Sequence, residues 1–260
     1  MNANVILNQE TDLDLKQKEG AMKVLSIDLA SRRYKDFGIA LLEVGSDEPT
    51  FPEPAELGLD GEPEASDCAA ALDAFCQTND VMVLLLDGPH AWRYPKSSIE
   101  HMRLAERVLN TPGKTGIPGQ AKPKNYLRYI QFSIDLFQHL HFDYQWSLID
   151  SQWHRKRKKR WVVESFPSAA WELLGLDRLP GKSKTKRADL NRFAKKLAKV
   201  TGYSLPKGLS HDQLQAAVVL PAGEAIAIRD PEGVLLVGID PIIDKDGNVL
   251  EGWIVEPRLS

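Results

Sequence analysis

Two short apolar segments of this chain each end on or beside an aspartate, and these acids are the first residues that could carry chemistry. The segment Met22–Ala30 reads MKVLSIDLA and contains Asp28, and the segment Val81–Asp87 reads VMVLLLD and ends on Asp87. Apolar runs with β-branched members predict buried strands. An ionised carboxylate is costly in an apolar core unless it has partners, so each acid belongs either to a structural ion pair or to a site. We interpret the two together as an active site at one end of a sheet.

Two further acids have a similar setting. Glu164 lies in a third apolar segment, Trp161–Phe166, and Asp212 follows Ser210, which can cap the start of a helix. Clustered carboxylates repel each other, so a fold tolerates them mainly when a cation neutralises them. Oxygen ligands favour Mg²⁺ or Mn²⁺, and two such ions about 3.5–4 Å apart can support hydrolysis of a phosphodiester by water. The structural alternative for each acid is a turn cap, an ion pair with an arginine or a favourable charge at a helix N-terminus.

The elements that must position these acids alternate between strands and helices. A second strand is predicted over Phe37–Val44, in a hairpin with the first, and a helix over Asp67–Gln77 leads into the strand that ends on Asp87. Further helices are predicted over Glu100–Leu109, Asn125–His141, Pro167–Gly175, Lys186–Val200 and His211–Arg229, and a C-terminal hairpin from Val234–Ile239 and Val249–Val255. The pattern favours an α/β fold with a mixed sheet flanked by helices.

Length and composition set the limits on this fold. The 260 residues, 43% hydrophobic and 27% charged, are typical of a globular protein with a real core. We expect a polar N-terminal tail over residues 1–21 and a single domain over residues 22–260, with a helical insertion at about Pro95–His154. Cys68 and Cys76 fit no zinc or redox motif and no disulfide framework, which predicts a reducing, cytoplasmic setting. No apolar run is long enough for a membrane span and no signal peptide precedes the first strand, so we expect no membrane partner.

Charge is distributed unevenly along the chain despite a net charge of −3. The stretch Glu43–Asp80 holds eleven acids and no Lys or Arg, whereas Ser151–Ser210 holds sixteen Lys and Arg and four acids. A local basic tract predicts contact with the phosphates of nucleic acid, with Trp153 and Trp161 available to stack on bases. The simpler alternative is a solvated face. The candidate phosphate-binding residues are Arg155, Lys156, Arg157, Lys158, Lys159, Lys182, Lys184 and Lys186.

Four short motifs resemble those of a known family. They are SIDLA at Ser26–Ala30, LDGP at Leu86–Pro89, ESFP at Glu164–Pro167 and HDQLQAA at His211–Ala217. In this order they resemble the ribonuclease-H-like nucleases grouped as domain-of-unknown-function family 429, and the segment Arg103–Glu106 resembles that family's Arg-plus-acid helix motif more weakly.

The resemblance covers about Met22–Ala222. It implies a ribonuclease-H-like fold and a metal-dependent nuclease. It makes the candidate catalytic residues and metal ligands Asp28, Asp87, Glu164 and Asp212. One position departs from the family, which often has a second acid three residues after the last aspartate. This chain has Gln215 there, which leaves one fewer possible ligand.

Two other classes of function stay open at this point. A phosphotransferase of the actin and sugar-kinase type shares the sheet pattern, but it needs a Gly/Thr-rich phosphate turn after the first strand. The segment Ser31–Asp36 has no glycine. A catalytically silent nucleic-acid-binding or assembly protein is favoured by Gln215. The sequence does not distinguish DNA from RNA, or endonuclease from exonuclease action.

Overall fold

A mixed β-sheet forms the centre of the protein in the computed structural model, which describes residues 21–156 and 159–258. Strand β1 (Lys23–Asp28) lies between β2 (Gly38–Glu43), which is antiparallel to it, and β3 (Val81–Asp87), which is parallel. Strand β7 (Trp161–Ser165) continues in parallel beside β3. The order across the sheet is β2-β1-β3-β7-β11-β8, and the short β6 (Ser147–Leu148) pairs with the start of β7.

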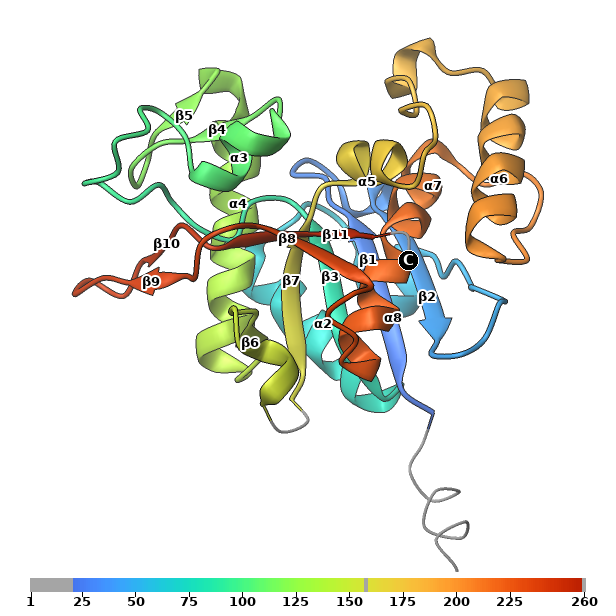
Figure 1. The fold of residues 1–260 in the computed structure, drawn as a ribbon, viewed down its shortest axis with the longest axis horizontal. Helices are drawn as coiled ribbons and strands as arrows, with labels where there is room; N and C mark the ends of the chain where they lie inside the picture. Colours follow the sequence, from blue (N-terminus) through green and yellow to red (C-terminus); the bar gives the residue numbers. More distant parts are fainter. Residues whose placement is uncertain (1–20, 157–158, 259–260) are drawn as a thin grey trace, which may run out of the picture.

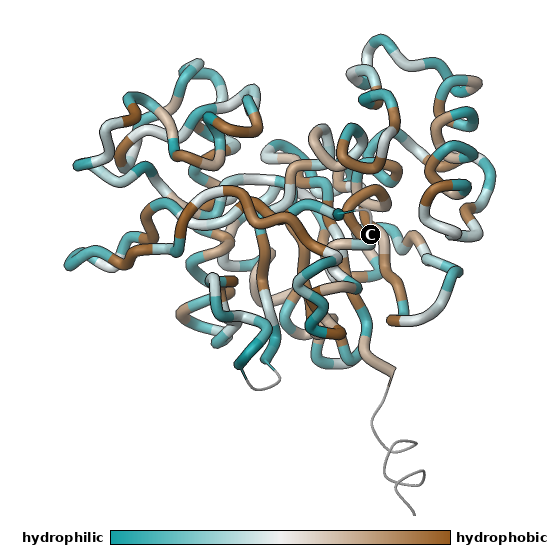
Figure 2. The backbone as a smooth tube through the Cα atoms, viewed as in Figure 1, coloured by the Kyte–Doolittle hydropathy of each residue, from teal (hydrophilic) through white to brown (hydrophobic). Residues whose placement is uncertain are grey.

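Helices cover both faces of this sheet (Figure 1). On one face lie α5 (Pro167–Leu173), α6 (Arg187–Thr201), α7 (His211–Val218) and α8 (Leu220–Ile228), whose apolar side chains form one core with alternate residues of the strands. On the other face lie α2 (Ala65–Thr78) and α4 (Leu127–Gln138), over a second core. The central strands of the sheet are largely apolar in Figure 2, as expected for strands with helices on both faces.

The predicted fold class is therefore confirmed. A hairpin of β1 and β2 is followed by parallel crossover strands β3 and β7, with helices on both faces of the sheet. This is the arrangement of a ribonuclease-H-like fold. The helix α2 provides the crossover between β2 and β3, as predicted from the sequence.

Several element boundaries differ from the prediction. The helix expected over His211–Arg229 is two helices, because Pro221 lies in the first turn of α8 and lacks the N–H that a continuous helix needs. The helix α3 (Leu104–Leu109) starts four residues later than predicted. Helix α4 ends at Gln138 and passes into a π-helical turn at His139–Asp143.

The C-terminal hairpin is present and extends the main sheet. Its strands β8 (Val234–Gly238) and β11 (Trp253–Pro257) pair antiparallel, and β11 also pairs with β7. Between them, β9 (Ile242–Ile243) and β10 (Val249–Leu250) form a small separate ribbon.

The segment of the predicted insertion carries α3, α4, the two-stranded ribbon of β4 (Lys114–Thr115) with β5 (Ala121–Lys122), and β6. Helix α3 and this ribbon form a lobe at the upper left of Figure 1. The division into a tail, a domain and an insertion stays a prediction, and residues 1–20 of the expected tail lie outside the described residues. In the described part of the chain, no helix combines the length and the apolar character that a membrane span requires.

Candidate active site

The aspartates Asp28 and Asp87 lie side by side at the carboxyl ends of β1 and β3. They are partners in the parallel register of these strands, so their side chains leave the sheet on the same face. The two buried carboxyls are close neighbours, and this favours a proton shared between them over two negative charges. Burial, followed by the charges of Asp87 and Asp212, raises the pKa of Asp28 well above its usual value. Burial raises the pKa of Asp87 to about 7.

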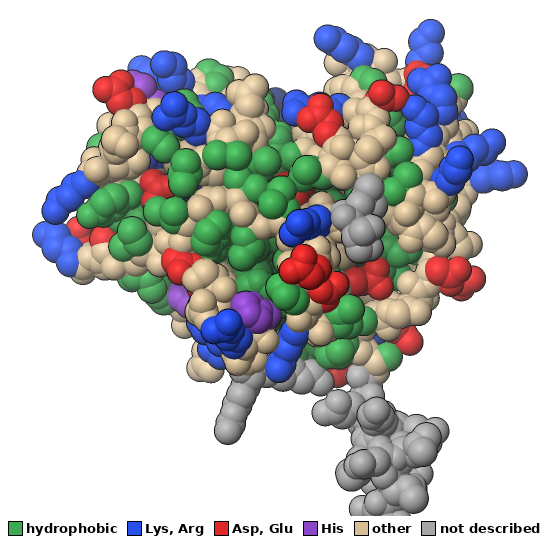
Figure 3. Space-filling view, in the orientation of Figure 1, with side chains coloured by type: hydrophobic (Ala, Val, Ile, Leu, Met, Phe, Trp, Pro, Cys, Tyr) green, Lys and Arg blue, Asp and Glu red, His purple; other side chains and the backbone are tan. Residues whose placement is uncertain are grey.

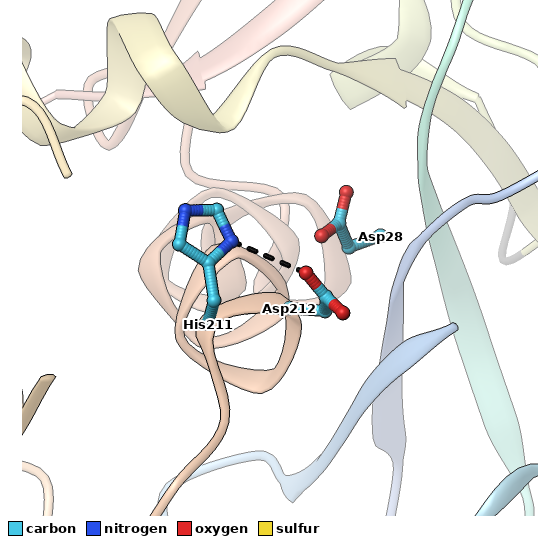
Figure 4. A group of neighbouring side chains, drawn as sticks. All are labelled: Asp28, His211 and Asp212. Carbon is cyan, nitrogen blue, oxygen red and sulfur yellow. Dashed lines mark hydrogen bonds and ion pairs between the residues drawn. The ribbon is translucent and has the colours of Figure 1, made fainter. Parts of the chain in front are cut away.

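Asp212 approaches this pair from the N-terminus of α7. Ser210 caps the helix by accepting a hydrogen bond from the Gln213 backbone N–H at 3.1 Å, as predicted. One ligand atom from each of Asp28, His211 and Asp212 lies within 4.8 Å of the other two, and Figure 4 shows the three side chains converging. Neither Asp28 nor Asp212 is balanced by a buried cation among the described residues.

The close approach of α7 depends on Gly38 in β2, which is the register partner of Asp28. A Cβ atom at this position would lie 2.0 Å from the backbone carbonyl carbon of Asp212 and 2.6 Å from the Gln213 nitrogen. Because these are backbone atoms of a helix, they cannot move aside without moving α7. The absence of a side chain at Gly38 therefore allows Asp212 to reach Asp28.

His211 was not among the predicted site residues, although it belongs to the motif that contains Asp212. Its Nε2 lies 3.0 Å from the carbonyl oxygen of Pro180, which can only accept, so Nε2 carries the hydrogen. In the neutral ring this leaves the Nδ1 lone pair directed at Asp212 Oδ1, 3.1 Å away. Two acceptors facing each other need a proton or a cation between them. The carbonyl of Pro180 thus fixes the tautomer that offers Nδ1 as a ligand.

One cation does reach the cluster from the surface. The Lys182 ammonium forms an ion pair with Asp212, and its side chain is 61% exposed while that of Asp212 is 14% exposed. Burial raises the pKa of Asp212. In the metal-free protein, a proton between His211 Nδ1 and the Asp212 carboxylate, together with the Lys182 ammonium, outweighs burial and holds this pKa below its usual value. Lys182 belongs to a short turn, Lys182–Lys184, that connects α5 to α6.

Glu164 differs from the expectation that it joins the other acids. It is the register partner of Leu86, whereas Ser165 pairs with Asp87, so the pleat directs Glu164 to the opposite face of the sheet. There the fully buried Arg103 donates to both of its oxygens, at 2.6 and 2.8 Å, and His90 donates to Oε2 from its backbone N–H at 2.9 Å.

These partners keep Glu164 ionised. Burial raises the pKa of Glu164, but the charge of Arg103 and the hydrogen bond from His90 outweigh it and hold the pKa at about 2. Arg103 also donates to Glu106 and Thr115, at 3.2 and 3.1 Å, so the network ties β7 to the lobe of α3 and β4. This arrangement gives Glu164 the role of an anchor for that lobe.

A cavity of about 450 Å³ opens beside the acids. Asp87 and Glu164 lie in its wall together with aromatic residues of the insertion and of the β7–α5 connection. Tyr129 donates a hydrogen bond to the backbone carbonyl of Asp87, which fixes the aromatic wall against the end of β3. A fifth acid, Glu256 of β11, is fully buried nearby, and burial raises its pKa well above the usual value.

The basic residues divide into two groups with different positions. Lys182, Lys184 and Lys186 are exposed on the turn that reaches Asp212, and Figure 3 shows Lys and Arg side chains gathered over this region at the upper right. The predicted group Arg155, Lys156 and Lys159 precedes β7, whereas the acids follow the strands, so about 15 Å of strand separates them. This second group does not flank the acids as expected, and its members Arg157 and Lys158 lie outside the described residues.

Two other expectations need correction. Trp153 and Trp161 are 2% and 5% exposed and belong to the core, so neither can stack on a base. Gln215, at the position where the family often has an acid, accepts a hydrogen bond from the indole of Trp171 at 2.7 Å. Because Trp171 is fully buried in α5, Gln215 joins α5 to α7.

Comparisons with known proteins add a distant likeness. No protein-family model matches the sequence, and no curated protein matches it, so membership of family 429 is not confirmed. Among solved structures, the chain aligns with RuvC of Thermus thermophilus at 10% identity and a TM-score of 0.36, over 78% of this chain and 95% of that one. It aligns with T. thermophilus RuvC in complex with a Holliday junction substrate at 10% identity and a TM-score of 0.35, over 80% and 91% of the two chains.

Proposed function

We propose that this protein is a metal-dependent nuclease that hydrolyses phosphodiester bonds in DNA or RNA, with Mg²⁺ or Mn²⁺ as cofactor. The observation that carries the proposal is the position of Asp28 at the carboxyl edge of the sheet, beside Asp87 in the strand register and with a ligand atom within 4.8 Å of ligand atoms of His211 and Asp212. The same residues occupy the motifs that resemble family 429, and membership of that family is part of the proposal.

The residues present fit a divalent cation. Asp28 and Asp87 are both buried, and two negative charges so close together repel each other, which favours a shared proton in the metal-free protein. A bound cation removes this repulsion. His211 Nδ1 adds a nitrogen ligand to the oxygen ligands, which favours Mn²⁺ over Mg²⁺.

The protein's own groups divide the work around this cluster. A divalent ion, when bound, lowers the pKa of water and offsets the charge of the phosphate. Asp28, His211 and Asp212 would hold the ion, and Asp87, beside Asp28, would add a further carboxylate. Lys182 lies where it can bind a phosphate oxygen once it leaves Asp212. Glu164 keeps the neighbouring lobe in place through Arg103 and is not assigned as a ligand.

The proposal is tested by incubating the protein with single- and double-stranded DNA and RNA, with Mg²⁺, with Mn²⁺ and with chelator. We expect cleavage only with a divalent ion. Asp28→Asn should keep the fold, because the amide can still donate to Asp87, and should lower cleavage by about a hundredfold or more.

The matched control is Asp80→Asn, at an exposed turn residue with φ of 55° that asparagine also adopts readily. This variant should cleave like wild type. If wild type binds nucleic acid but cleaves none with either ion, the protein is a silent binding protein and the proposal is wrong.

A further inference from the structure

The cavity of about 450 Å³ beside the acids is a candidate substrate site in its own right. It lies between the β7–α5 connection and the predicted insertion, and its walls include Phe166 from the first and Tyr126 and Tyr129 from the second. Asp87 and Glu164 belong to the same wall, so the cavity adjoins the place where hydrolysis is proposed. Its volume falls in the range typical of small-molecule sites.

The charge of the cavity restricts what it can bind. Its lining includes the acids Asp87, Glu106 and Glu164 and no Lys or Arg. Arg103, the cation that pairs with Glu164, is fully buried and is not part of the lining. A phosphate or carboxylate would therefore be repelled, whereas a neutral, flat group with hydrogen-bond donors is compatible with both the acids and the aromatic walls.

One polar group in the wall lacks a partner. Ser165 lines the cavity and is 1% exposed, and its buried Oγ has no hydrogen-bond partner among the described residues. A buried hydroxyl without a partner costs free energy unless a ligand supplies one. The hydroxyl of Tyr129 is already engaged by the carbonyl of Asp87, so this residue offers the cavity its ring.

The surroundings differ on the two sides of the acid cluster. The exposed lysines of the turn Lys182–Lys184 approach it through Asp212, and the aromatic cavity, whose lining holds acids but no Lys or Arg, adjoins it through Asp87. A phosphodiester chain crossing the acids would place phosphate beside the lysines and a sugar with its base beside the cavity. Figure 1 shows the turn between α5 and α6 at the upper right and the lobe of α3 at the upper left.

We propose that this cavity binds the nucleoside next to the scissile phosphate, with the base against Tyr126 and Phe166 and hydrogen-bonded to Ser165 Oγ. This inference rests on the proposed nuclease function and deepens it. It implies that the enzyme binds one unpaired nucleotide, turned out of the strand, in the cavity. Bases that carry an exocyclic amine, namely adenine, cytosine and guanine, are favoured over uracil and thymine by the acids in the wall.

The test uses metal-free protein and the four ribonucleosides at millimolar concentration, with D-ribose as the sugar control, and measures binding by saturation-transfer NMR and titration. We expect adenosine, cytidine or guanosine to bind and ribose not to bind. Tyr126→Ala should weaken binding at least about fivefold. Phe142→Ala, at an aromatic residue that is 48% exposed and outside the cavity, should leave it unchanged.

Ser165→Ala separates a binding role from a structural one. Because Ser165 Oγ has no partner among the described residues, its removal should leave the melting temperature of the free protein equal or higher, while weakening nucleoside binding about threefold or more. Absence of nucleoside binding, equal binding of ribose, or wild-type affinity in both variants would overturn the inference. If nucleosides do not bind but the same preparation shows metal-dependent cleavage, only the inference about the cavity fails. If nucleosides bind but no cleavage occurs, only the nuclease proposal fails.

Discussion

The buried contact between Arg103 and Glu164 makes a quantitative prediction about stability. The pKa of Glu164 is held at about 2, whereas its ordinary value is 4.5. A pKa difference of 1 corresponds to about 1.4 kcal/mol, so this contact contributes about 3 kcal/mol to the free energy of unfolding at neutral pH. Because the folded-state pKa is lowered, this contribution is present above about pH 4.5 and is lost as the pH falls towards 2.

Two variants and their combination test this contribution. Arg103→Met should cost about 3–5 kcal/mol at pH 7, because it leaves the buried carboxylate of Glu164 without its cation. In the Glu164→Gln background the same change should cost about 3 kcal/mol less, since Glu106 still loses its cation but Glu164 no longer does. The assay is urea denaturation at pH 7 and at pH 3, where the difference should shrink.

Metal binding is the second part of the same test. Glu164→Gln should leave the Mn²⁺ affinity within about twofold of wild type, because both oxygens of Glu164 already bind Arg103 and His90 on the other face of the sheet. Asp28→Asn should lose Mn²⁺ binding. The reasoning is refuted if the two variants Arg103→Met and Glu164→Gln are additive within about 0.5 kcal/mol, or if Glu164→Gln loses Mn²⁺ as Asp28→Asn does.

Three further predictions concern the acid cluster. The metal-free protein should lose about 4 kcal/mol of stability or more as the pH rises from about 4 to about 7, because the folded state keeps protons on Asp28 and Asp87 that the unfolded chain releases. Saturating Mn²⁺ should abolish this slope in thermal melts. Lys182→Met should tighten Mn²⁺ binding by about two- to fivefold in calorimetry, since the exposed ammonium competes for Asp212, whereas Lys184→Met should not. Mn²⁺-loaded wild type should show ¹⁴N coupling from an imidazole in pulsed electron paramagnetic resonance, and His211→Ala should lack it and bind Mn²⁺ about tenfold more weakly or worse.

The central strands and the two strand-end aspartates could be predicted from the sequence because the signal is local. The apolar runs that end at Asp28 and Asp87 define strands, and parallel strands bring their carboxyl ends to one edge. Glu164 shows where local patterns stop. It lies one residue before the end of β7, and only the register, which pairs Ser165 with Asp87, shows that it faces the other side.

Two other differences could have been inferred from strand direction and from proline. The basic residues Arg155 and Lys159 come before a strand whose acid comes near its end, so they lie at the other edge of a parallel sheet. Pro221 indicates a break in the helix predicted through it. The contact between Arg103 and Glu164, in contrast, joins residues 61 positions apart, and no local pattern predicts such a contact.

His211 was not predicted as a site residue, although the sequence contained a clear signal for it. It directly precedes Asp212 in the first turn of a capped helix, but its role depends on the carbonyl of Pro180, which approaches from another loop. The sequence gives residue types and spacing, whereas the tautomer of an imidazole depends on a contact across the fold.

The close approach at Gly38 has a consequence for how such a site would be mapped by experiment. Alanine scanning removes side chains and attributes the lost activity to the atoms removed, but at Gly38 it adds an atom, 2.0 Å from the backbone of Asp212. Gly38→Ala would displace α7 and separate Asp212 from Asp28 while every acid remained intact. In a scan of this protein, a residue without a side chain would therefore score like a catalytic one.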